Sequence, residues 1–338
     1  MVNITRFLKE VSKNPRKVFN VVGMKIMSRF EPRKMYFYPS FLAIEPTINC
    51  NLDCVMCQKN TLRRTKRELE FDDFKRIIDK MPFLRVLNLQ GIGEPFLNKD
   101  FFKMIEYAHS KGIRVYTFSN ANLITKKIAK QIIHSSLMEL IVSIDGANKQ
   151  TYEKIRRQAS FDKLLNNLKY LFSIRESKKL KISAWVVPNI YNMEEIEEIV
   201  KLCNKIGFDE IVIQSKLSVY SYKKEVYSTN KRINVNNNPL FKSRLLKIKN
   251  SHPNVRICDD VELSTHNKCR WPWTSMFISS DGYIIPCCVI SDPNVANFGN
   301  ILEKGFREIW NSKEYQQFRK DIRDNKVPFY CLDCYSKI

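Results

Sequence analysis

The sequence predicts an α/β protein: a partial (βα)6 barrel of the TIM type, followed by a small C-terminal module of a β-hairpin and a helix. Two observations lead to this fold class. From residue 41 onward, short apolar runs rich in β-branched residues alternate six times with segments of helical periodicity, as in a parallel sheet covered by helices. A chain of 338 residues is long enough for one such domain and a smaller module, whereas six units fall short of the eight that close a TIM barrel.

The predicted elements divide the chain into four parts. Residues 1–40 form a basic amphipathic segment, 41–215 the barrel, 216–268 a linker or insertion, and 269–338 the C-terminal module. The predicted strands are 41–45, 85–89, 114–118, 139–144, 181–187 and 210–213, and the predicted helices are 71–81, 100–110, 126–135, 151–174 and 193–206. In the C-terminal module, we expect strands at 276–279 and 283–286 with a turn at Ser280-Asp281-Gly282, and then a helix at 301–323.

The N-terminal segment combines an apolar helical stripe with nine basic and two acidic residues. Asn14-Pro15 is typical of an N-cap followed by a proline in the first helical turn, so it separates two predicted helices. Our preferred interpretation is that these helices cap the bottom of the barrel. The alternative is a peripheral contact with an anionic membrane surface.

The charge and the cysteines limit the partners and the compartment. The 57 lysines and arginines exceed the 35 aspartates and glutamates by 22, which suggests an anionic substrate or, alternatively, a solvated basic surface. We find no signal peptide and no apolar run of the roughly 18 residues that a membrane span needs. The ten cysteines are therefore expected in the cytoplasm, where clustered thiols indicate metal binding or catalysis instead of disulfides.

The first cysteine cluster directly follows the first predicted strand, where the active-site loops of such barrels lie. Cys50, Cys54 and Cys57 form a C-x3-C-x2-C loop. Three thiolates at this spacing can hold three irons of a [4Fe–4S] cluster, and the fourth iron stays open to bind and reduce a small molecule. A zinc knuckle and three buried structural thiols are the alternatives.

This loop and the strand ends after it resemble the radical S-adenosylmethionine (SAM) enzymes. Gly91-Ile92-Gly93-Glu94-Pro95 is similar to the family's GGEP motif, Ser119-Asn120-Ala121 to its Thr-Asn-Gly segment, and Ser143-Ile144-Asp145-Gly146 to its Ser-hydrophobic-Asp-Gly segment. The resemblance implies that the open iron holds the amino and carboxylate groups of SAM and that reductive cleavage yields a 5′-deoxyadenosyl radical. The SAM contacts implied by the resemblance are Met56, Gly93, Glu94, Asn120, Ser143, Asp145 and Arg156.

Three of these residues suit particular groups of SAM. The carboxylate of Glu94 matches the amino group, and the guanidinium of Arg156 can hold the carboxylate through two hydrogen bonds. Met56 stands where the family often has an aromatic residue near adenine, so it would act as an apolar packing residue. For Asn120 and Asp145, a role in turns at the strand ends is the alternative.

The C-terminal cysteines resemble the SPASM/twitch module of the same enzymes. Cys269, Gly282-x4-Cys287 and Cys331-x2-Cys334 match the shorter twitch form, which holds one auxiliary [4Fe–4S] cluster on four thiolates. Such a closed cluster favours electron transfer over substrate binding. The alternative is a four-cysteine zinc ribbon. Cys288, next to Cys287, is left as a spare or substrate-facing thiol.

Together, the motifs predict a radical SAM oxidoreductase. We expect a hydrogen abstraction completed as a two-electron, alcohol dehydrogenase-type oxidation of a small, anionic or sugar-like substrate, with flavodoxin or ferredoxin as the reducing partner. One alternative is a maturase that forms a thioether, a carbon–carbon bond or formylglycine in a ribosomal peptide or protein. The other is a non-enzymatic, metal-stabilised nucleic-acid binder, but no signature of specific nucleic-acid recognition is present. No residue is nominated as the catalytic base.

Overall fold

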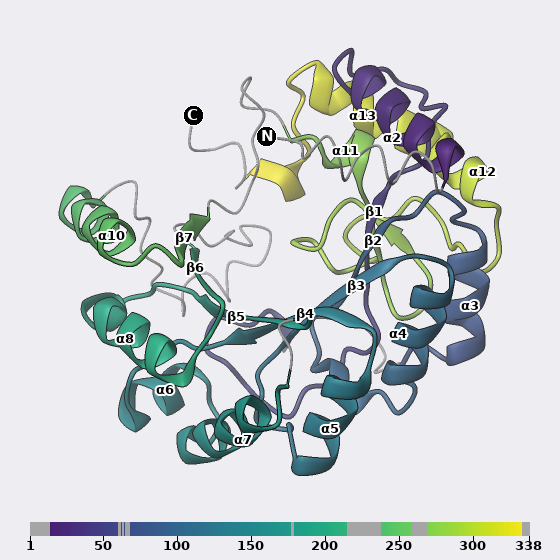
Figure 1. Cartoon of the computed structure of the whole chain (residues 1–338). Coiled ribbons are helices and arrows are strands. Elements are labelled where there is room, and N and C mark those ends of the chain that lie inside the picture. The colour runs from purple at the N-terminus through teal and green to yellow at the C-terminus, as the bar shows by residue number, and fades with distance from the viewer. Residues whose placement is uncertain are drawn as a thin grey trace.

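A single curved sheet organises the molecule. The structure, a computed structural model, describes residues 14–59, 62, 64, 68–176, 179–214, 238–258 and 269–332. The sheet has the strand order β7-β6-β5-β4-β3-β2-β1-β8-β9, in which β7 to β8 are parallel and β9 is antiparallel to β8. Figure 1 shows the parallel strands as an arc with helices on its outer side. This is a barrel open on one side, and it confirms the predicted fold class.

The strands begin and end close to the predicted positions. They are β1 (Phe41–Ile44), β2 (Val86–Leu89), β3 (Arg114–Ser119), β4 (Leu137–Ser143), β5 (Lys181–Val186), β6 (Glu210–Gln214), β7 (Val255–Cys258), β8 (Phe277–Ile278) and β9 (Ile284–Ile285). The seventh parallel strand, β7, falls within 216–268, which the sequence analysis treated as a linker. Only Val255 of its four residues is buried, so β7 contains no apolar run that sequence periodicity could detect.

The helices cover the outer side of the arc. They are α3 (Phe71–Asp79), α4 (Phe101–Ser110), α5 (Lys126–His134), α6 (Lys149–Ile155), α7 (Phe161–Ser173), α8 (Ile196–Ile206) and α10 (Pro239–Ser251), with short 3-10 turns η2 (Pro95–Leu97) and η3 (Met193–Glu195). The predicted core position of Cys203 in α8 is confirmed, because its side chain is fully buried.

The prediction of one continuous helix over 151–174 is wrong, because α6 and α7 are separate helices. Between them, Gln158 has a φ of +67°, which lies outside the helical range. Ser160 then starts α7, since its side chain accepts a hydrogen bond from the backbone N–H of Lys163 at 3.2 Å. Arg156 therefore lies at the end of α6 instead of inside a helix.

The two faces of the sheet differ in polarity. The outer face carries the apolar core, where side chains such as Val142 are fully buried against the helices. On the inner face, the strand register brings Tyr116, Glu139 and Lys181 into one row across β3, β4 and β5. The Lys181 ammonium lies 3.0 Å from the Glu139 carboxylate and 2.6 Å from that of Glu210. The interior of the open barrel is thus lined with charged and aromatic side chains.

The C-terminal module continues the barrel sheet. Its elements are α11 (Trp271–Thr274), β8, β9, α12 (Phe306–Trp310), α13 (Lys313–Arg323) and the 3-10 turn η5 (Phe329–Cys331). The predicted hairpin is confirmed, with Gly282 at φ +86° in its turn. The predicted helix 301–323 is instead two helices, because Asn311 is the C-cap of α12 and Ser312 is the N-cap of α13. β8 pairs with β1 through Ala43–Phe277 and Ile44–Ile278.

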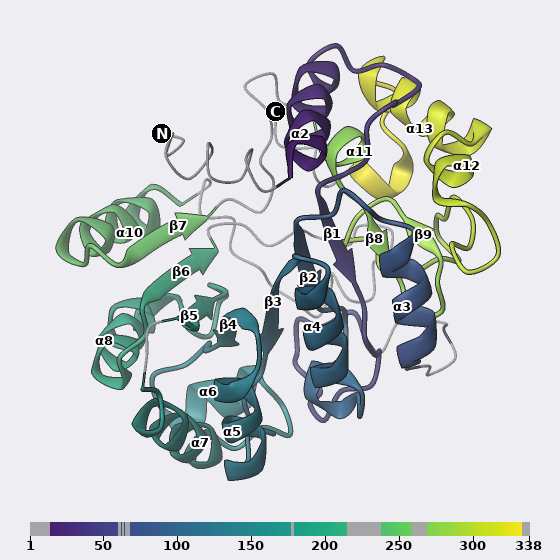
Figure 2. The same cartoon turned by 45° about the vertical axis from the view of Figure 1, so that its right-hand side comes forward.

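The N-terminal helix α2 (Pro15–Ser28) lies at the amino end of the strands. As predicted, the Asn14 side chain caps it by accepting the backbone N–H of Lys17 at 3.1 Å. The Lys17 ammonium donates to the carbonyls of Leu84 and Lys111, just before β2 and β3. In both views α2 lies beside α11 (Figure 2). The first predicted N-terminal helix lies outside the described residues.

Within the part of the chain that the structure describes, every helix is too short or too polar to cross a membrane.

Candidate active site

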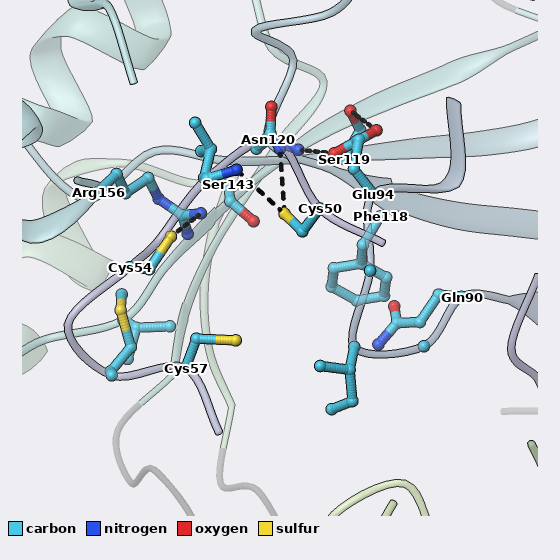
Figure 3. A pocket seen from close by; sticks show the side chains of 16 residues that line it. Cys50, Cys54, Cys57, Gln90, Glu94, Phe118, Ser119, Asn120, Ser143 and Arg156 are labelled. Atoms are coloured by element: carbon cyan, nitrogen blue, oxygen red, sulfur yellow. Dashed lines mark hydrogen bonds between the residues drawn. The ribbon is translucent and has the colours of Figure 1, made fainter. Parts of the chain in front are cut away.

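The carboxyl ends of β1 to β4 surround one cavity of about 250 Å³. Nine of the predicted site residues line it: Cys50, Cys54, Met56, Cys57, Gly93, Glu94, Asn120, Ser143 and Arg156. In Figure 3, the side chains of Cys50, Cys54 and Cys57 lie around a common space, near Asn120 and Arg156. Asp145 does not line the cavity, but it contacts Arg156, which does. The structure therefore brings these nine predicted residues into one site.

The cysteine loop is fixed by the break between α6 and α7. The backbone N–H of Asp53 donates to the carbonyl of Arg157 at 3.0 Å, and that of Val55 to the carbonyl of Ile155 at 2.9 Å. Within the loop, the N–H of Cys57 donates to the carbonyl of Cys54 at 3.0 Å. Because α6 ends at Ile155, the Ile155 carbonyl has no partner within the helix and can accept the hydrogen bond from the cysteine loop.

The thiols occupy a partly dehydrated environment with hydrogen-bond donors. Burial raises the pKa of all three thiols, and it raises that of Cys57 to about 12. Backbone N–H groups lie 3.4 Å from the sulfurs of Cys50 and Cys57, and the Arg156 guanidinium lies 3.9 Å from that of Cys54. In a protein without metal these thiols stay protonated, so metal binding would release their protons.

The donor set fits an iron–sulfur cluster. Three thiols with N–H donors directed at sulfur are the ligand type that such clusters take. Among the described residues, no three His, Cys, Asp or Glu side chains meet at a position suited to a single metal ion. The three thiols instead border a space large enough for a bigger group.

Gly93 allows the end of β2 to approach the cysteine loop closely. A Cβ at this position would lie 2.4 Å from the carbonyl oxygens of both Thr47 and Asn49, which is too close for any side chain. The neighbouring N–H of Glu94 donates to the Asn49 carbonyl at 2.8 Å. The glycine therefore positions Glu94 at the wall of the cavity.

Glu94 is a buried carboxylate held by the end of β3. One carboxylate oxygen accepts a hydrogen bond from the Ser119 hydroxyl at 2.8 Å, and the other accepts one from the backbone N–H of Asn120 at 2.9 Å. Burial raises its pKa to about 7, although these hydrogen bonds act in the opposite direction. The Asn120 amide in turn donates to the side chain of Asn51 at 3.0 Å, which ties β3 to the cysteine loop.

Asp145 holds Arg156 in place. Its Oδ2 lies 2.8 Å from Nε and 2.6 Å from Nη2 of Arg156, and its Oδ1 accepts the N–H of Val187 at 2.8 Å. Burial acts to lower the pKa of Arg156, but the Asp145 carboxylate outweighs this and keeps it above the usual value. The remaining Nη1 of Arg156 faces Cys54, so the guanidinium spans the space between Asp145 and the thiol.

Of the seven cavity residues that the sequence analysis did not propose as contacts, three carry a polar group or a ring: Gln90, Phe118 and Ser119. Their common signal is that each stands at or next to the carboxyl end of β2 or β3. The buried Oε1 of Gln90 accepts no hydrogen bond from the described residues, so it is an acceptor available to a bound molecule. Phe118 packs edge to face against Trp185 with ring centroids 5.3 Å apart, next to the inner face of the barrel.

The C-terminal module gathers a second group of thiols. Burial raises the pKa of Tyr315 and of Tyr330, and smaller contributions in the same direction come from Cys269 and Cys287 at Tyr315 and from Cys331 and Cys287 at Tyr330. Three predicted ligands therefore lie near this pair of tyrosines, and the fourth, Cys334, lies outside the described residues. Burial raises the pKa of Cys287.

Cys288 belongs to a different surface from these ligands. It packs with Ala43, Phe277 and Ile285, and it adds to the increase that burial causes in the pKa of Tyr116, on the inner face of the barrel. Of the two interpretations left open for this thiol, its position supports the one that faces the barrel interior.

A buried polar network joins the two cysteine regions. We use the name inter-module clasp for Glu45, Gln58, Arg64, Ser280 and Ser291. Arg64 lies 2.6 Å from the Glu45 carboxylate and donates to the Ser280 hydroxyl and the Ser291 carbonyl, each at 3.0 Å. The Gln58 amide, directly after Cys57, donates to the Ser291 hydroxyl at 2.9 Å. The clasp therefore fixes the C-terminal module against the cysteine loop.

Two family models match the chain. Residues 44–215 match the model of the radical SAM superfamily, and residues 269–335 match that of the iron–sulfur cluster-binding SPASM domain. Two similar curated proteins align along nearly their whole length. The tungsten-containing aldehyde ferredoxin oxidoreductase cofactor-modifying protein of Pyrococcus furiosus is 24% identical over 87% of this chain and 86% of its own length. The AdoMet-dependent heme synthase of Methanosarcina barkeri is 27% identical over 89% and 90%.

A maturase and a structure with a bound precursor peptide are also similar. The mycofactocin maturase MftC of Mycolicibacterium smegmatis is 32% identical, but over only 50% of this chain and 43% of its own length. The crystal structure of Streptococcus suis SuiB bound to its precursor peptide SuiA has a TM-score of 0.70 at 19% identity, covering 89% of this chain and 71% of that one. At this identity the structural match shows the shared fold alone.

Proposed function

The chain belongs to the radical SAM superfamily and carries a C-terminal SPASM domain, and from this premise we propose that it oxidises a small, anionic or hydroxylated substrate by two electrons. The observation that carries the proposal is the single cavity that Cys50, Cys54 and Cys57 share with Glu94 and Arg156. When bound there, a [4Fe–4S] cluster supplies the reductive cleavage of SAM to a 5′-deoxyadenosyl radical, which removes a hydrogen atom from the substrate.

In this proposal, the chain's own residues bind and orient SAM. Arg156, held by Asp145 on one side, offers its remaining N–H groups to the carboxylate of SAM. The Glu94 carboxylate accepts a hydrogen bond from the amino group of SAM, and its hydrogen bonds from Ser119 and Asn120 hold it in place. Ser143 and Asn120 add polar contacts. Met56 packs against the adenine, because no aromatic side chain stands at that position.

The second half of the oxidation is proposed for the C-terminal module. Cys269, Cys287, Cys331 and Cys334 would hold an auxiliary [4Fe–4S] cluster, which would supply an acceptor for the one electron that the substrate radical gives up as its hydroxyl proton leaves to solvent. The product is a ketone or aldehyde, and 5′-deoxyadenosine carries the abstracted hydrogen. Four thiolates leave that cluster without an open iron, which suits an electron acceptor.

The inner face of the barrel is the proposed substrate space. It continues from the cavity past Phe118 and Trp185 to the row of Tyr116, Glu139 and Lys181. Polar groups of both signs suit a hydroxylated molecule, and the net charge of +22 favours an anionic one.

The relatives support a small molecule over a peptide. Those that align end to end are named for cofactor modification and heme synthesis, whereas the mycofactocin maturase aligns over half of this chain. Peptide maturation remains the second candidate function, because SuiB in complex with its precursor peptide has the same fold. The enzymatic assignment leaves the nucleic-acid-binding alternative without support.

The first test is SAM cleavage by the anaerobically reconstituted protein. With dithionite and SAM, the wild type should release 5′-deoxyadenosine, measured by mass spectrometry, and Cys54→Ala should release none. Cys203→Ala is the matched control, because Cys203 is buried in the core away from both cysteine regions, and it should remain active. Equal activity in Cys54→Ala and wild type would refute the assignment of this loop.

The second test separates the two substrate classes. Small hydroxylated anions and peptides are supplied as pools, and the products are compared by mass. A product two hydrogens lighter than a small substrate, formed in equal amount with 5′-deoxyadenosine, supports the proposal. Modification of peptides alone would replace it with the second candidate.

A further inference from the structure

Helix α2 presents its apolar stripe to solvent. Phe19 is 71% exposed, Ile26 56% and Phe30 77%, and Val22 and Tyr36 are also exposed. Phe19, Val22 and Ile26 are spaced at three and four residues along α2, so they share one face of the helix, and Phe30 and Tyr36 follow in the segment after it. Among the described residues, no other helix places so many large exposed hydrophobic side chains on one face. The name α2 outer face is used below for these five residues.

The opposite side of α2 packs against the protein through the buried residues Asn20, Met24 and Ser28, so the outward orientation of the stripe is built into the fold. The buried Asn20 side chain donates to the Tyr38 carbonyl at 2.8 Å and accepts the Tyr38 N–H at 2.9 Å. The buried Ser28 hydroxyl donates to the Lys25 carbonyl at 3.0 Å. Rotation of the helix to bury its apolar stripe would break both contacts of Asn20 with Tyr38 and would expose Met24, which is buried in the core.

Basic side chains flank the α2 outer face. All are exposed, and the described residues offer them no acidic partner within ion-pair distance: Arg16, Lys25, Arg29, Arg33 and Lys34. Within residues 14–36, Glu31 is the one acidic residue. An apolar stripe bordered by lysine and arginine is typical of helices that lie in the interface of an anionic bilayer.

An apolar hollow of about 420 Å³ opens at one end of this face. Phe19, Tyr36 and Phe83 are among its walls, and Arg16 and Arg307 also line it. Aromatic walls beside two guanidinium groups suit a molecule with an apolar chain and an anionic head, which is the chemistry of a phospholipid.

We propose that the α2 outer face and its flanking basic residues bind the surface of an anionic phospholipid membrane. The hydrogen bonds of Lys17 place α2 at the amino end of the strands, whereas the active-site cavity opens at their carboxyl ends. The bound protein therefore keeps its active site turned away from the bilayer, and its substrate arrives from the aqueous side.

The test is flotation of the reconstituted full-length holoenzyme with vesicles. One set is neutral phosphatidylcholine, and in the other about a third of the lipid is anionic phosphatidylglycerol. We expect the wild type to float with the anionic set and at least tenfold less with the neutral one, and added salt should weaken the binding. Sedimentation away from both sets, or equal flotation with both, would overturn the proposal.

Matched variants locate the surface. Phe19→Ser/Ile26→Ser should float at least tenfold less than the wild type, whereas Leu240→Ser/Leu246→Ser, which changes two exposed leucines of α10, should float like it. The charge variant Lys25→Gln/Arg29→Gln/Lys34→Gln should also lose flotation, with Lys126→Gln/Lys127→Gln/Lys130→Gln on α5 as its control. Equal losses in variants and controls would refute the assignment to α2.

Two further readouts keep the result unambiguous. Release of 5′-deoxyadenosine should be unchanged in all four variants, because none of them alters the active site. Sedimentation velocity identifies the competing occupant: a wild-type dimer that becomes monomeric in Phe19→Ser/Ile26→Ser, without vesicle binding, would assign this face to a second copy of the chain and refute the membrane proposal.

Discussion

Replacing Arg64 with methionine should reveal how strongly the inter-module clasp holds the two parts of the protein together. The side chains of Arg64 and Glu45 are 2% and 0% exposed, and their charged atoms lie 2.6 Å apart. Methionine keeps much of the volume of the arginine stem but removes the charge. Among the described residues, the Glu45 carboxylate then keeps only neutral donors, from the N–H of Ile92 and from the N–H and hydroxyl of Ser280.

The expected loss follows from leaving a buried charge without its partner, which costs about 3–5 kcal/mol. Globular proteins gain about 2.1 cal/mol/K of unfolding entropy per residue, so a chain of 338 residues should lose roughly 4–7 °C in Tm. The control is Arg244→Met. Arg244 lies 2.7 Å from Glu194, but the two side chains are 42% and 71% exposed. An exposed pair contributes about 0–1 kcal/mol, so this variant should shift Tm by less than about 2 °C.

The assay is thermal unfolding of the metal-free protein, followed by circular dichroism, so that cluster loss does not distort the transition. The double variant Glu45→Gln/Arg64→Met removes the stranded charge and should recover part of the Tm lost in Arg64→Met. Equal Tm shifts in Arg64→Met and Arg244→Met would refute the argument. So would a double variant whose two losses simply add.

The remaining predictions concern the site. Gly93→Ala places a Cβ 2.4 Å from two backbone carbonyl oxygens and should reduce release of 5′-deoxyadenosine at least tenfold, whereas Gly305→Ala, with no atom within 4 Å of its Cβ, should leave it unchanged. Because burial raises the pKa of Glu94 to about 7 and only its carboxylate attracts the SAM ammonium, wild-type SAM affinity should fall by up to tenfold per pH unit below pH 7. Glu94→Gln should bind SAM weakly without this slope, and a slope retained in the variant would assign it to another group. Cys287→Ala should still cleave SAM but lose the oxidised product; unchanged product would mean that the auxiliary cluster does not accept the electron.

The sequence predicted the parts of the fold that local patterns determine. The first six strands are apolar runs, and the thiols of Cys50, Cys54 and Cys57 follow a spacing with its own chemical meaning. The break between α6 and α7 contains no glycine or proline to indicate it. It depends on the backbone of Gln158 and on hydrogen bonds to the cysteine loop, a segment distant in sequence.

Other features depend on contacts that no local pattern contains. The clasp residues Gln58 and Arg64 look like ordinary polar residues until the fold brings them to Ser291. Helix α2 is an instructive case, because its apolar periodicity was detected correctly but does not indicate which side faces the protein. The paired contacts of Asn20 determine that orientation, and they depend on Tyr38 outside the helix.

The pairing of β1 with β8 has a consequence for how the protein is made. The N–H groups of Ala43 and Glu45 donate to the carbonyls of Met276 and Ile278. Strand β1 is among the first to leave the ribosome, but it can complete this pairing only after β8, one of the last strands, has been synthesised. Throughout synthesis of the barrel, that edge of β1 lacks its partner, and unpaired strand edges promote aggregation. Contacts this distant in sequence also form slowly. Nascent chains that end before β8 should therefore depend on chaperones more than the finished protein does, and the barrel without the C-terminal module should make a poor fragment for expression.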